Sequence, residues 1–277
     1  MKNTTTIAAK DGLELFIRSW IPPQYKAVIA LFHGFGEHSG RYQHVADFFN
    51  AHGYAVVAID NRGHGKSGGK RGHSPSFEMT LDDTELFITH AKKMTNDALP
   101  FFLYGHSMGG NFVLNTLLRR NPKSITGAVV TGPLISLSFK PNAVLVFLGR
   151  FLRTLAPTFS QPGGLKTEHL SRDASVVTAY INDPLVHGTI TSAAGMDLLE
   201  ASEFLDKYAG ALPVPTLIMH GGEDFVTSQP RSEAFVKRIS SGNITYRKYE
   251  GLYHEIHNEP EKEQVLGELL TWLDAHV

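Results

Sequence analysis

The stretch FFLYGHSMGG, residues 101–110, places a serine between glycines where a strand pattern gives way to a helix pattern. Residues 101–104 form a short apolar run typical of a buried strand, and the residues after Gly110 repeat apolar side chains at helical spacing. In a G-x-S-x-G turn of this kind the serine is strained and its hydroxyl lies at the carboxyl edge of the sheet. The stretch therefore predicts a nucleophilic Ser107, with a plain glycine-rich connector as the alternative.

Strand and helix patterns alternate along most of the chain. Several apolar runs are continuous, as in parallel strands that are buried on both faces. This alternation predicts an α/β protein whose mostly parallel central sheet is flanked by helices. The expected strands are 14–20, 28–33, 55–60, 101–105, 127–131, 216–220 and 245–249, and the expected helices are 41–52, 81–94, 109–120, 230–239 and 261–276.

One interval, between residues 133 and 211, interrupts this alternation, because it holds no convincing strand and is longer than a simple crossover. We expect a mostly helical cap, or lid, at 134–200 over the carboxyl edge of the sheet. The α/β core would then comprise 1–133 and 201–277. The cap contains an apolar stripe at helical spacing, formed by Val144, Phe147, Leu148, Phe151, Leu152 and Leu155.

Leu145 and Val146 are apolar too and lie off the centre of this stripe. A helix that is apolar on one side needs only the protein core beneath that side, whereas a second apolar side needs another partner. We expect that partner to be a long acyl chain or a lipid surface. Packing of both sides inside the cap, or against a second subunit, is the alternative.

Composition excludes several classes of protein. The 277 residues carry a formal net charge of −1, which favours neither nucleic acid nor an anionic membrane as a partner. Cysteine is absent, so disulfides and thiolate metal sites are excluded, and no histidine cluster has metal-ligand spacing. The first residues lack the apolar run of a secretory signal, and no run approaches the roughly 20 residues of a membrane span. We expect a cytoplasmic protein that can associate peripherally with membranes.

A nucleophilic serine needs a base, and the base needs an acid that orients it. In this architecture the chain order is serine, acid, histidine. Asp224 lies on the loop just after the expected strand 216–220, which is where the acid belongs. Glu223 is the neighbouring alternative.

The base is expected in the next strand-to-loop junction. His254 follows the expected strand 245–249 and precedes the last helix. His257, three residues further on, and His276, near the end of the terminal helix, are the alternatives.

The oxyanion of the reaction intermediate needs two N–H donors. Met108 supplies one at the start of the helix that follows Ser107. The segment 31–36 reads LFHGFG, a strand that ends in H-G-x-G, and predicts Phe35 as the second donor.

Several segments together resemble the monoacylglycerol lipases of the α/β-hydrolase fold. The resemblance runs nearly end to end, and it implies that Ser107, Asp224 and His254 form a catalytic triad and that Phe35 and Met108 form the oxyanion hole. The segments are HGFGEHSGRY at 33–42, DNRGHGKS at 60–67, GHSMGG at 105–110, SRD at 171–173, YINDPLV at 180–186 and YEGLYHE at 249–255.

The resemblance also implies a substrate site. Glu37, Arg41, Tyr180 and His257 fall where the family shapes the glycerol end of its pocket. Phe35 stands where some relatives carry a smaller residue, which would narrow the pocket.

The activity implied is cleavage of monoacylglycerols, small lipid esters, to glycerol and fatty acid through an acyl-enzyme, with no metal or organic cofactor. A short-chain carboxylesterase and a lysophospholipase remain as alternatives. So do a serine peptidase that cleaves N-terminal residues, with Glu37 binding the substrate amine, and a non-catalytic receptor.

Overall fold

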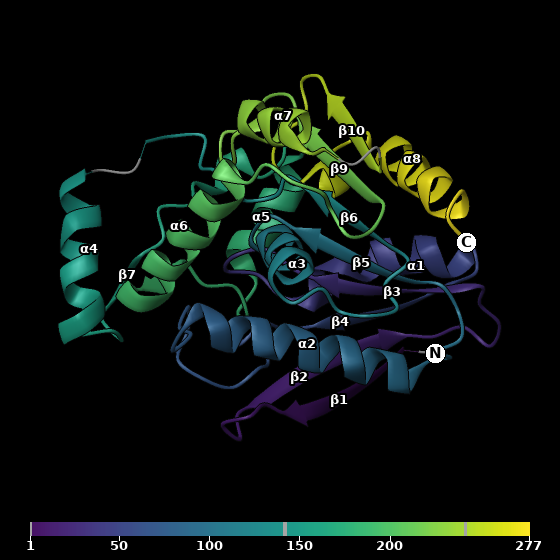
Figure 1. Cartoon of the computed structure of the whole chain (residues 1–277), viewed down its shortest axis with the longest axis horizontal. Coiled ribbons are helices and arrows are strands. Elements are labelled where there is room, and N and C mark those ends of the chain that lie inside the picture. The colour runs from purple at the N-terminus through teal and green to yellow at the C-terminus, as the bar shows by residue number, and fades with distance from the viewer. Residues whose placement is uncertain (1, 141–142, 241–242) are drawn as a thin grey trace.

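The structure is a computed structural model that describes residues 2–140, 143–240 and 243–277; the side chain of Leu145 lies outside the described part. Its centre is an eight-stranded sheet, which Figure 1 shows running through the middle of the molecule. In spatial order the strands are β1 (Lys2–Ala8), β2 (Glu14–Trp20), β4 (Tyr54–Ile59), β3 (Ala27–Phe32), β5 (Phe101–His106), β6 (Gly127–Thr131), β9 (Thr216–Gly221) and β10 (Ile244–Tyr249).

The sheet is mostly parallel, as predicted. All neighbours from β4 to β10 run parallel, whereas β1 pairs with β2 and β2 pairs with β4 in antiparallel fashion. Every residue of the central strands β3, β4, β5 and β6 is buried, which explains their continuous apolar sequences. The edge strand β1 was not predicted, because six of its seven residues are exposed and its sequence is largely polar.

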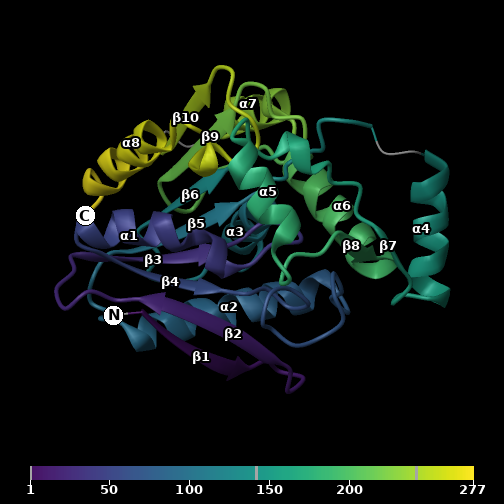
Figure 2. The same ribbon diagram turned by 180° about the vertical axis from the view of Figure 1, so that it is seen from behind.

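Helices cover both faces of the sheet. The helix α2 begins at Phe77, about one turn before the predicted start, because the Ser76 hydroxyl caps it by accepting a hydrogen bond from the Met79 N–H at 3.1 Å. One face carries α2 (Phe77–Met94), α3 (Met108–Arg119), α6 (Ser192–Lys207) and α7 (Gln229–Arg238), and the other, seen in Figure 2, carries α1 (Gln43–Ala51) and α8 (Lys262–Asp274).

The cap segment lies at one end of the molecule, beyond the carboxyl edge of the sheet (Figure 1). The prediction that 133–211 holds no strand was wrong, because two three-residue strands pair there in antiparallel fashion. Strands this short carry too few residues to show an alternating pattern. The elements are α4 (Ala143–Leu155), β7 (Ser160–Pro162), α5 (Ala174–Asn182) and β8 (Thr189–Thr191), and the expected boundary at residue 200 falls within α6.

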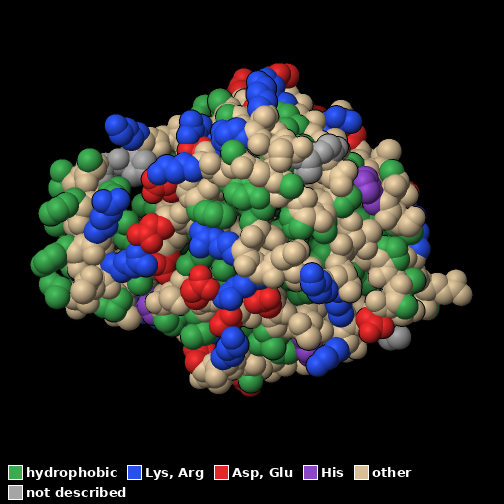
Figure 3. All heavy atoms as spheres, in the orientation of Figure 1, with side chains coloured by type: hydrophobic (Ala, Val, Ile, Leu, Met, Phe, Trp, Pro, Cys, Tyr) green, Lys and Arg blue, Asp and Glu red, His purple; other side chains and the backbone are tan. Residues whose placement is uncertain are grey.

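The apolar stripe of α4 faces solvent and not the protein core. Five of its six residues are exposed, and Figure 3 shows hydrophobic side chains gathered over α4 at the left edge. The helix packs its other side on α6, where Gly149 is buried and Arg153 forms ion pairs with Asp197 and Glu200 at 2.6 and 2.8 Å. The exposed members of the stripe are Val144, Phe147, Leu148, Phe151 and Leu155.

Polar contacts join the cap to the loop that follows β3. The His187 N–H donates to the Gly36 carbonyl at 2.9 Å, and His38 Nε2 lies 2.9 Å from Asp183 Oδ2. The cap is therefore attached beside the H-G-F-G turn. Among the described residues, no helix has both the length and the apolar character that a membrane crossing requires.

Candidate active site

Ser107 lies on the sharp turn between β5 and α3. Its backbone has φ 53° and ψ −113°, a conformation that is costly for a residue other than glycine. The turn is held by three backbone bonds, since the Ser107 N–H donates to Thr131 O and the Ser107 carbonyl accepts from Asn111 and Leu134, each at 3.0 Å. Strain of this kind is typical of a serine whose side chain is presented for reaction.

The glycines on either side of Ser107 allow the helix to approach the sheet. A Cβ on Gly105 would lie 2.5 Å from the carbonyl oxygen of Gly109, and a Cβ on Gly109 would lie 2.2 Å from that of Phe32. No side chain fits at either position. The first turn of α3 therefore lies directly over the end of β3.

Asp224 and His254 form a buried pair. His254 Nδ1 donates to Asp224 Oδ2 at 2.7 Å, and the exposed fractions of the two residues are 3% and 7%. The other carboxylate oxygen, Oδ1, accepts the backbone N–H groups of Val226 and Thr227 at 2.7 and 2.9 Å. These bonds fix both the orientation of the carboxylate and the ring tautomer of His254.

Two residues that were not predicted complete the surroundings of Asp224. The Thr227 hydroxyl donates to Oδ2 at 2.8 Å, and His220 Nε2 lies 3.1 Å from the same atom. Because a carboxylate only accepts, His220 carries its proton on Nε2, and its Nδ1 accepts from the Ser232 hydroxyl at 3.0 Å. The only signal in the sequence was a histidine at the end of a strand, four residues before the acid.

The acid–histidine pair shifts the pKa values of both partners. Burial disfavours the imidazolium of His254, but the charge of Asp224 and the hydrogen bond outweigh burial, so the pKa of His254 is raised. Burial would raise the pKa of Asp224, but His254 and His220 hold it well below its usual range. Asp224 is therefore an anion that stabilises the protonated form of His254.

The alternative acid and bases lie elsewhere. Glu223 is exposed, and His276, which follows α8, bonds the Trp272 carbonyl of that helix. His257 is buried behind the site, stacked on Tyr42, and burial lowers its pKa to about 3.

The two expected oxyanion donors lie at the same edge of the sheet. Met108 is the first residue of α3, where an N–H has no acceptor within the helix. The Phe35 N–H donates to no acceptor within the described part of the chain. The turn that carries it is anchored by Glu37, whose Oε1 accepts the Gly34 N–H at 2.6 Å.

Ser107, His254 and Asp224 line one cavity of about 920 Å³ between the sheet and the cap. This volume suits a ligand of moderate size. Most of the wall is apolar and comes from the cap and from the loops after β6 and β9. Its larger apolar residues include Leu134, Leu137, Phe139, Val146, Leu165, Met196, Leu198, Leu199, Phe225 and Val226.

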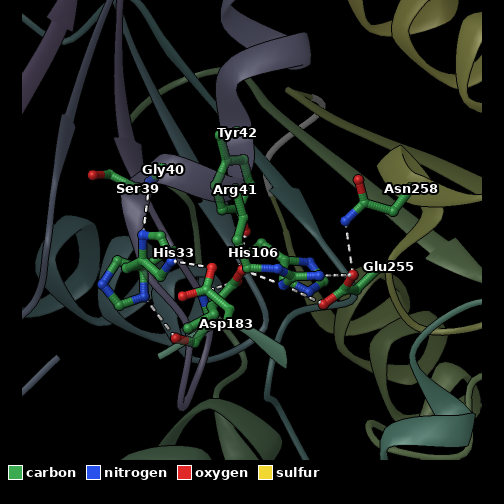
Figure 4. A network of polar contacts seen from close by, with 12 residues as sticks. His33, Ser39, Gly40, Arg41, Tyr42, His106, Asp183, Glu255 and Asn258 are labelled. Atoms are coloured by element: carbon green, nitrogen blue, oxygen red, sulfur yellow. Dashed lines mark hydrogen bonds and ion pairs between the residues drawn. The ribbon is translucent and has the colours of Figure 1, made fainter. Parts of the chain in front are cut away.

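The four residues expected to bind substrate divide into two pairs. Glu37 and Tyr180 line the cavity, whereas Arg41 and His257 are not among its lining residues. Arg41 lies behind Glu37 and donates to it at 2.5 Å, and Figure 4 shows the network around it. The Phe35 side chain lines the cavity and meets the rings of His64 and His187 edge-on.

Glu255, which was not predicted, also lines the cavity. Its two oxygens accept from the two terminal nitrogens of Arg41, each at 2.7 Å. The signal in the sequence was only its position next to His254. Among the described residues, no group of three or more His, Cys, Asp or Glu side chains is arranged to hold a metal ion.

A strained serine between a strand and a helix, with a buried aspartate–histidine pair on the same cavity, defines a serine hydrolase of the α/β-hydrolase fold. Residues 23–261 match the family described as serine aminopeptidase, S33, and the chain belongs to this family.

Relatives extend the comparison over nearly the whole chain. A monoacylglycerol lipase of Mycolicibacterium smegmatis is 35% identical over 98% of this chain and 97% of its own length. A phospholipase of Bacillus subtilis is 32% identical over 94% of this chain and 99% of its own length. An abhydrolase domain-containing protein of Dictyostelium discoideum is 35% identical over 99% of this chain, which spans only 29% of that protein.

The crystal structure of the Paleococcus ferrophilus monoacylglycerol lipase superimposes with a TM-score of 0.84 and 30% identity, covering all of both chains. The predicted fold class, an α/β-hydrolase with a mostly parallel sheet, is confirmed.

Proposed function

We propose that the chain hydrolyses monoacylglycerols to glycerol and free fatty acid, with Ser107 as nucleophile. The observation that carries this proposal is the 2.7 Å bond between His254 and Asp224 on the wall of a largely apolar cavity that Ser107 also lines. The monoacylglycerol lipases among the relatives and solved structures support the substrate.

In the first half of the reaction the Ser107 oxygen attacks the ester carbonyl, and His254 Nε2 takes the hydroxyl proton. Asp224 stabilises the imidazolium that forms. The N–H groups of Phe35 and Met108 bind the negative oxygen of the tetrahedral intermediate. The intermediate collapses to an acyl-enzyme, and glycerol leaves with the proton that His254 returns.

In the second half a water molecule attacks the acyl-enzyme. His254 again accepts a proton, now from the water, and returns it to the Ser107 oxygen as the fatty acid leaves. The low pKa of Asp224 keeps its charge in place through both steps.

The cap, which we place at 134–200, would cover the acyl chain. Val146 of α4, together with Leu198 and Leu199 of α6, lines the apolar part of the cavity. The exposed stripe of α4 would provide transient contact with the membrane or micelle that holds the substrate.

A substrate panel tests this function. The purified protein is given 1-oleoylglycerol, p-nitrophenyl butyrate, 1-oleoyl-lysophosphatidylcholine and leucine p-nitroanilide, and kcat/KM is compared. We expect 1-oleoylglycerol to give the highest value. Preferential cleavage of the anilide would identify a peptidase instead, and binding of oleoylglycerol without turnover would identify a receptor.

A further inference from the structure

The polar end of the cavity is built around Arg41, which forms ion pairs with two carboxylates. Its NH1 donates to Glu37 Oε2 at 2.5 Å and to Glu255 Oε1 at 2.7 Å, and its NH2 donates to Glu255 Oε2 at 2.7 Å. The side chain of Arg41 is only 10% exposed, and the Tyr180 ring lies against its guanidinium, 4.7 Å from Cζ. Figure 4 shows Glu255 between Arg41 and Asn258.

The carboxylates, and not the guanidinium, are on the cavity wall. Glu37 and Glu255 both line the cavity with Ser107, and Arg41 does not. Glu37 lies close to the nucleophile Ser107, because both border Gly34. A Cβ placed on Gly34 would lie 2.9 Å from Glu37 Oε1 and 3.3 Å from the Ser107 Cβ. Glu37 therefore lies next to Ser107, and Glu255 shares Arg41 with it, so we infer that the alcohol part of an ester bound at Ser107 would occupy this end of the cavity.

The three groups carry one excess negative charge. Arg41 forms ion pairs with both carboxylates, at 2.5 Å with Glu37 and at 2.7 Å with Glu255, so one guanidinium faces two carboxylates. Burial opposes the charge of Glu255, but the nearby guanidinium of Arg41 keeps the pKa of this carboxyl well below its usual range. Among the described lining residues the one lysine or arginine is Lys166, an exposed cap residue that forms no ion pair with Glu37 or Glu255.

The hydrogen bonds leave two oxygens with spare capacity. Glu37 Oε1 accepts from the Gly34 N–H and the Tyr42 hydroxyl, and Glu255 Oε2 accepts from Arg41 and from Asn258. Among the described residues, Glu37 Oε2 and Glu255 Oε1 each accept only from Arg41 NH1, and a carboxylate oxygen has room for two donors. An alcohol with two free hydroxyl groups, such as the glycerol of a monoacylglycerol, would supply the two donors required.

We propose that Glu255, together with Glu37, determines head-group specificity by selecting uncharged, hydroxyl-donating alcohols and excluding head groups that carry a phosphate monoester. This inference rests on the proposed function and concerns the choice among lipid esters. A phosphate monoester carries between one and two negative charges at neutral pH and mainly acceptor oxygens. Its oxygens would meet carboxylate oxygens with no cation on the wall beside them, an arrangement that is strongly disfavoured.

The test compares two lipids with the same acyl chain and the same scissile ester, 1-oleoylglycerol and 1-oleoylglycerol 3-phosphate, both in micelles of an uncharged detergent. Release of oleate gives kcat/KM for each. We expect the wild-type value for the phosphate to be lower by roughly 100-fold or more. Values within threefold of each other would overturn the inference, and this comparison needs no variant.

A charge-neutral variant separates charge from size. Glu255→Gln keeps the shape of the side chain and removes one charge. We expect this variant to reduce the ratio of kcat/KM for 1-oleoylglycerol to kcat/KM for 1-oleoylglycerol 3-phosphate by at least about tenfold. The ratio is informative because any loss of activity common to both substrates cancels. Glu250→Gln is the matched control, since Glu250 is 78% exposed, pairs with Lys248 and is not among the residues that line the cavity.

The outcomes distinguish this inference from the function on which it rests. An unchanged ratio in Glu255→Gln, as in the control, would show that size and not charge excludes the phosphate. Failure of the wild-type protein to cleave 1-oleoylglycerol would instead reject the proposed function.

Discussion

His220 and Thr227 hold the Asp224 oxygen that His254 also uses. Oδ2 is contacted by three donors, at 2.7 Å from His254, 2.8 Å from Thr227 and 3.1 Å from His220. His220 is fully buried and is fixed on its far side by Ser232. We infer that His220 is a positioning residue, acting through Asp224.

Replacing His220 tests this role. His220→Leu removes a hydrogen bond to a charged acceptor, which is worth about 1.5 kcal/mol or more, so we expect kcat on p-nitrophenyl butyrate to fall roughly tenfold with little change in KM. His220→Gln can still donate to Asp224 and should recover most of that loss. Equal losses in both variants would show that His220 contributes only packing.

The pH dependence follows from the raised pKa of His254. His254 must be neutral to accept the serine proton, so kcat/KM falls as the pH drops through the pKa of the free enzyme. Because that pKa is raised, the midpoint of the acid limb should lie above 6.5, the ordinary value for histidine. A midpoint clearly below 6.5 in a pH–rate profile would contradict the charge environment described.

The same profile reports on Glu255. The negative charge of Glu255 contributes to raising the pKa of His254, so Glu255→Gln should move the acid limb to lower pH. Glu250→Gln, the exposed control, should leave the midpoint where it is. A limb that does not move in Glu255→Gln would mean that this charge is screened from the base.

The positions of Ser107, Asp224 and His254 were predictable because each follows a strand of a parallel sheet. The carboxyl ends of such strands meet at one edge, so the order of patterns along the chain brings the three side chains together. His220 and Glu255 were not predictable on this basis. The chain has fourteen histidines, and one sequence does not distinguish a buried hydrogen-bonded histidine from a surface one.

At the scale of the element, α4 shows what a sequence pattern leaves undetermined. Its apolar stripe predicted a helix, which the structure contains, but the stripe faces solvent and the helix packs through Gly149 and Arg153. Periodicity shows that apolar residues share one face, but not what that face contacts. A glycine and an arginine gave no signal for the packed side.

Val146 is the described residue that tests the inner side of α4, since it lines the cavity. Val146→Asp places a charge against the acyl chain and should lower kcat/KM for 1-oleoylglycerol by roughly tenfold or more, because each buried CH₂ contributes about 0.8 kcal/mol. Hydrolysis of p-nitrophenyl acetate should change little.

Phe147→Asp is the matched control for Val146, because this neighbouring side chain is 69% exposed. When 1-oleoylglycerol is present as monomers, Phe147→Asp should show the same kcat/KM as the wild-type protein. If Val146→Asp lowered kcat/KM equally for 1-oleoylglycerol and for p-nitrophenyl acetate, with an unchanged Tm, the acyl chain would not contact this face of α4.

At the scale of the whole molecule, α4 has an exposed apolar stripe on one side and contributes Val146 to the cavity wall on another. A lipid surface against the stripe would bring the cavity close to substrate dissolved in that surface.

A triple variant in which serine replaces Phe147, Phe151 and Leu155 tests this role. Its co-sedimentation with phosphatidylcholine vesicles should be lower than that of the wild-type protein by roughly tenfold or more. Cleavage of soluble p-nitrophenyl acetate should be retained, and Val277→Ser, an exposed position on the C-terminal residue, should bind vesicles normally. Undiminished vesicle binding by the triple variant would contradict a lipid-facing role for the stripe.

We infer that Ser107 is the nucleophile of this molecule. A fluorophosphonate probe reacts with an activated serine, so after labelling and proteolysis mass spectrometry should place one adduct on the peptide that contains Ser107. Ser107→Ala should take up no probe and lose esterase activity by roughly 10⁴-fold or more while keeping its fold. An adduct on a different serine, or a folded Ser107→Ala variant with wild-type turnover, would contradict the account.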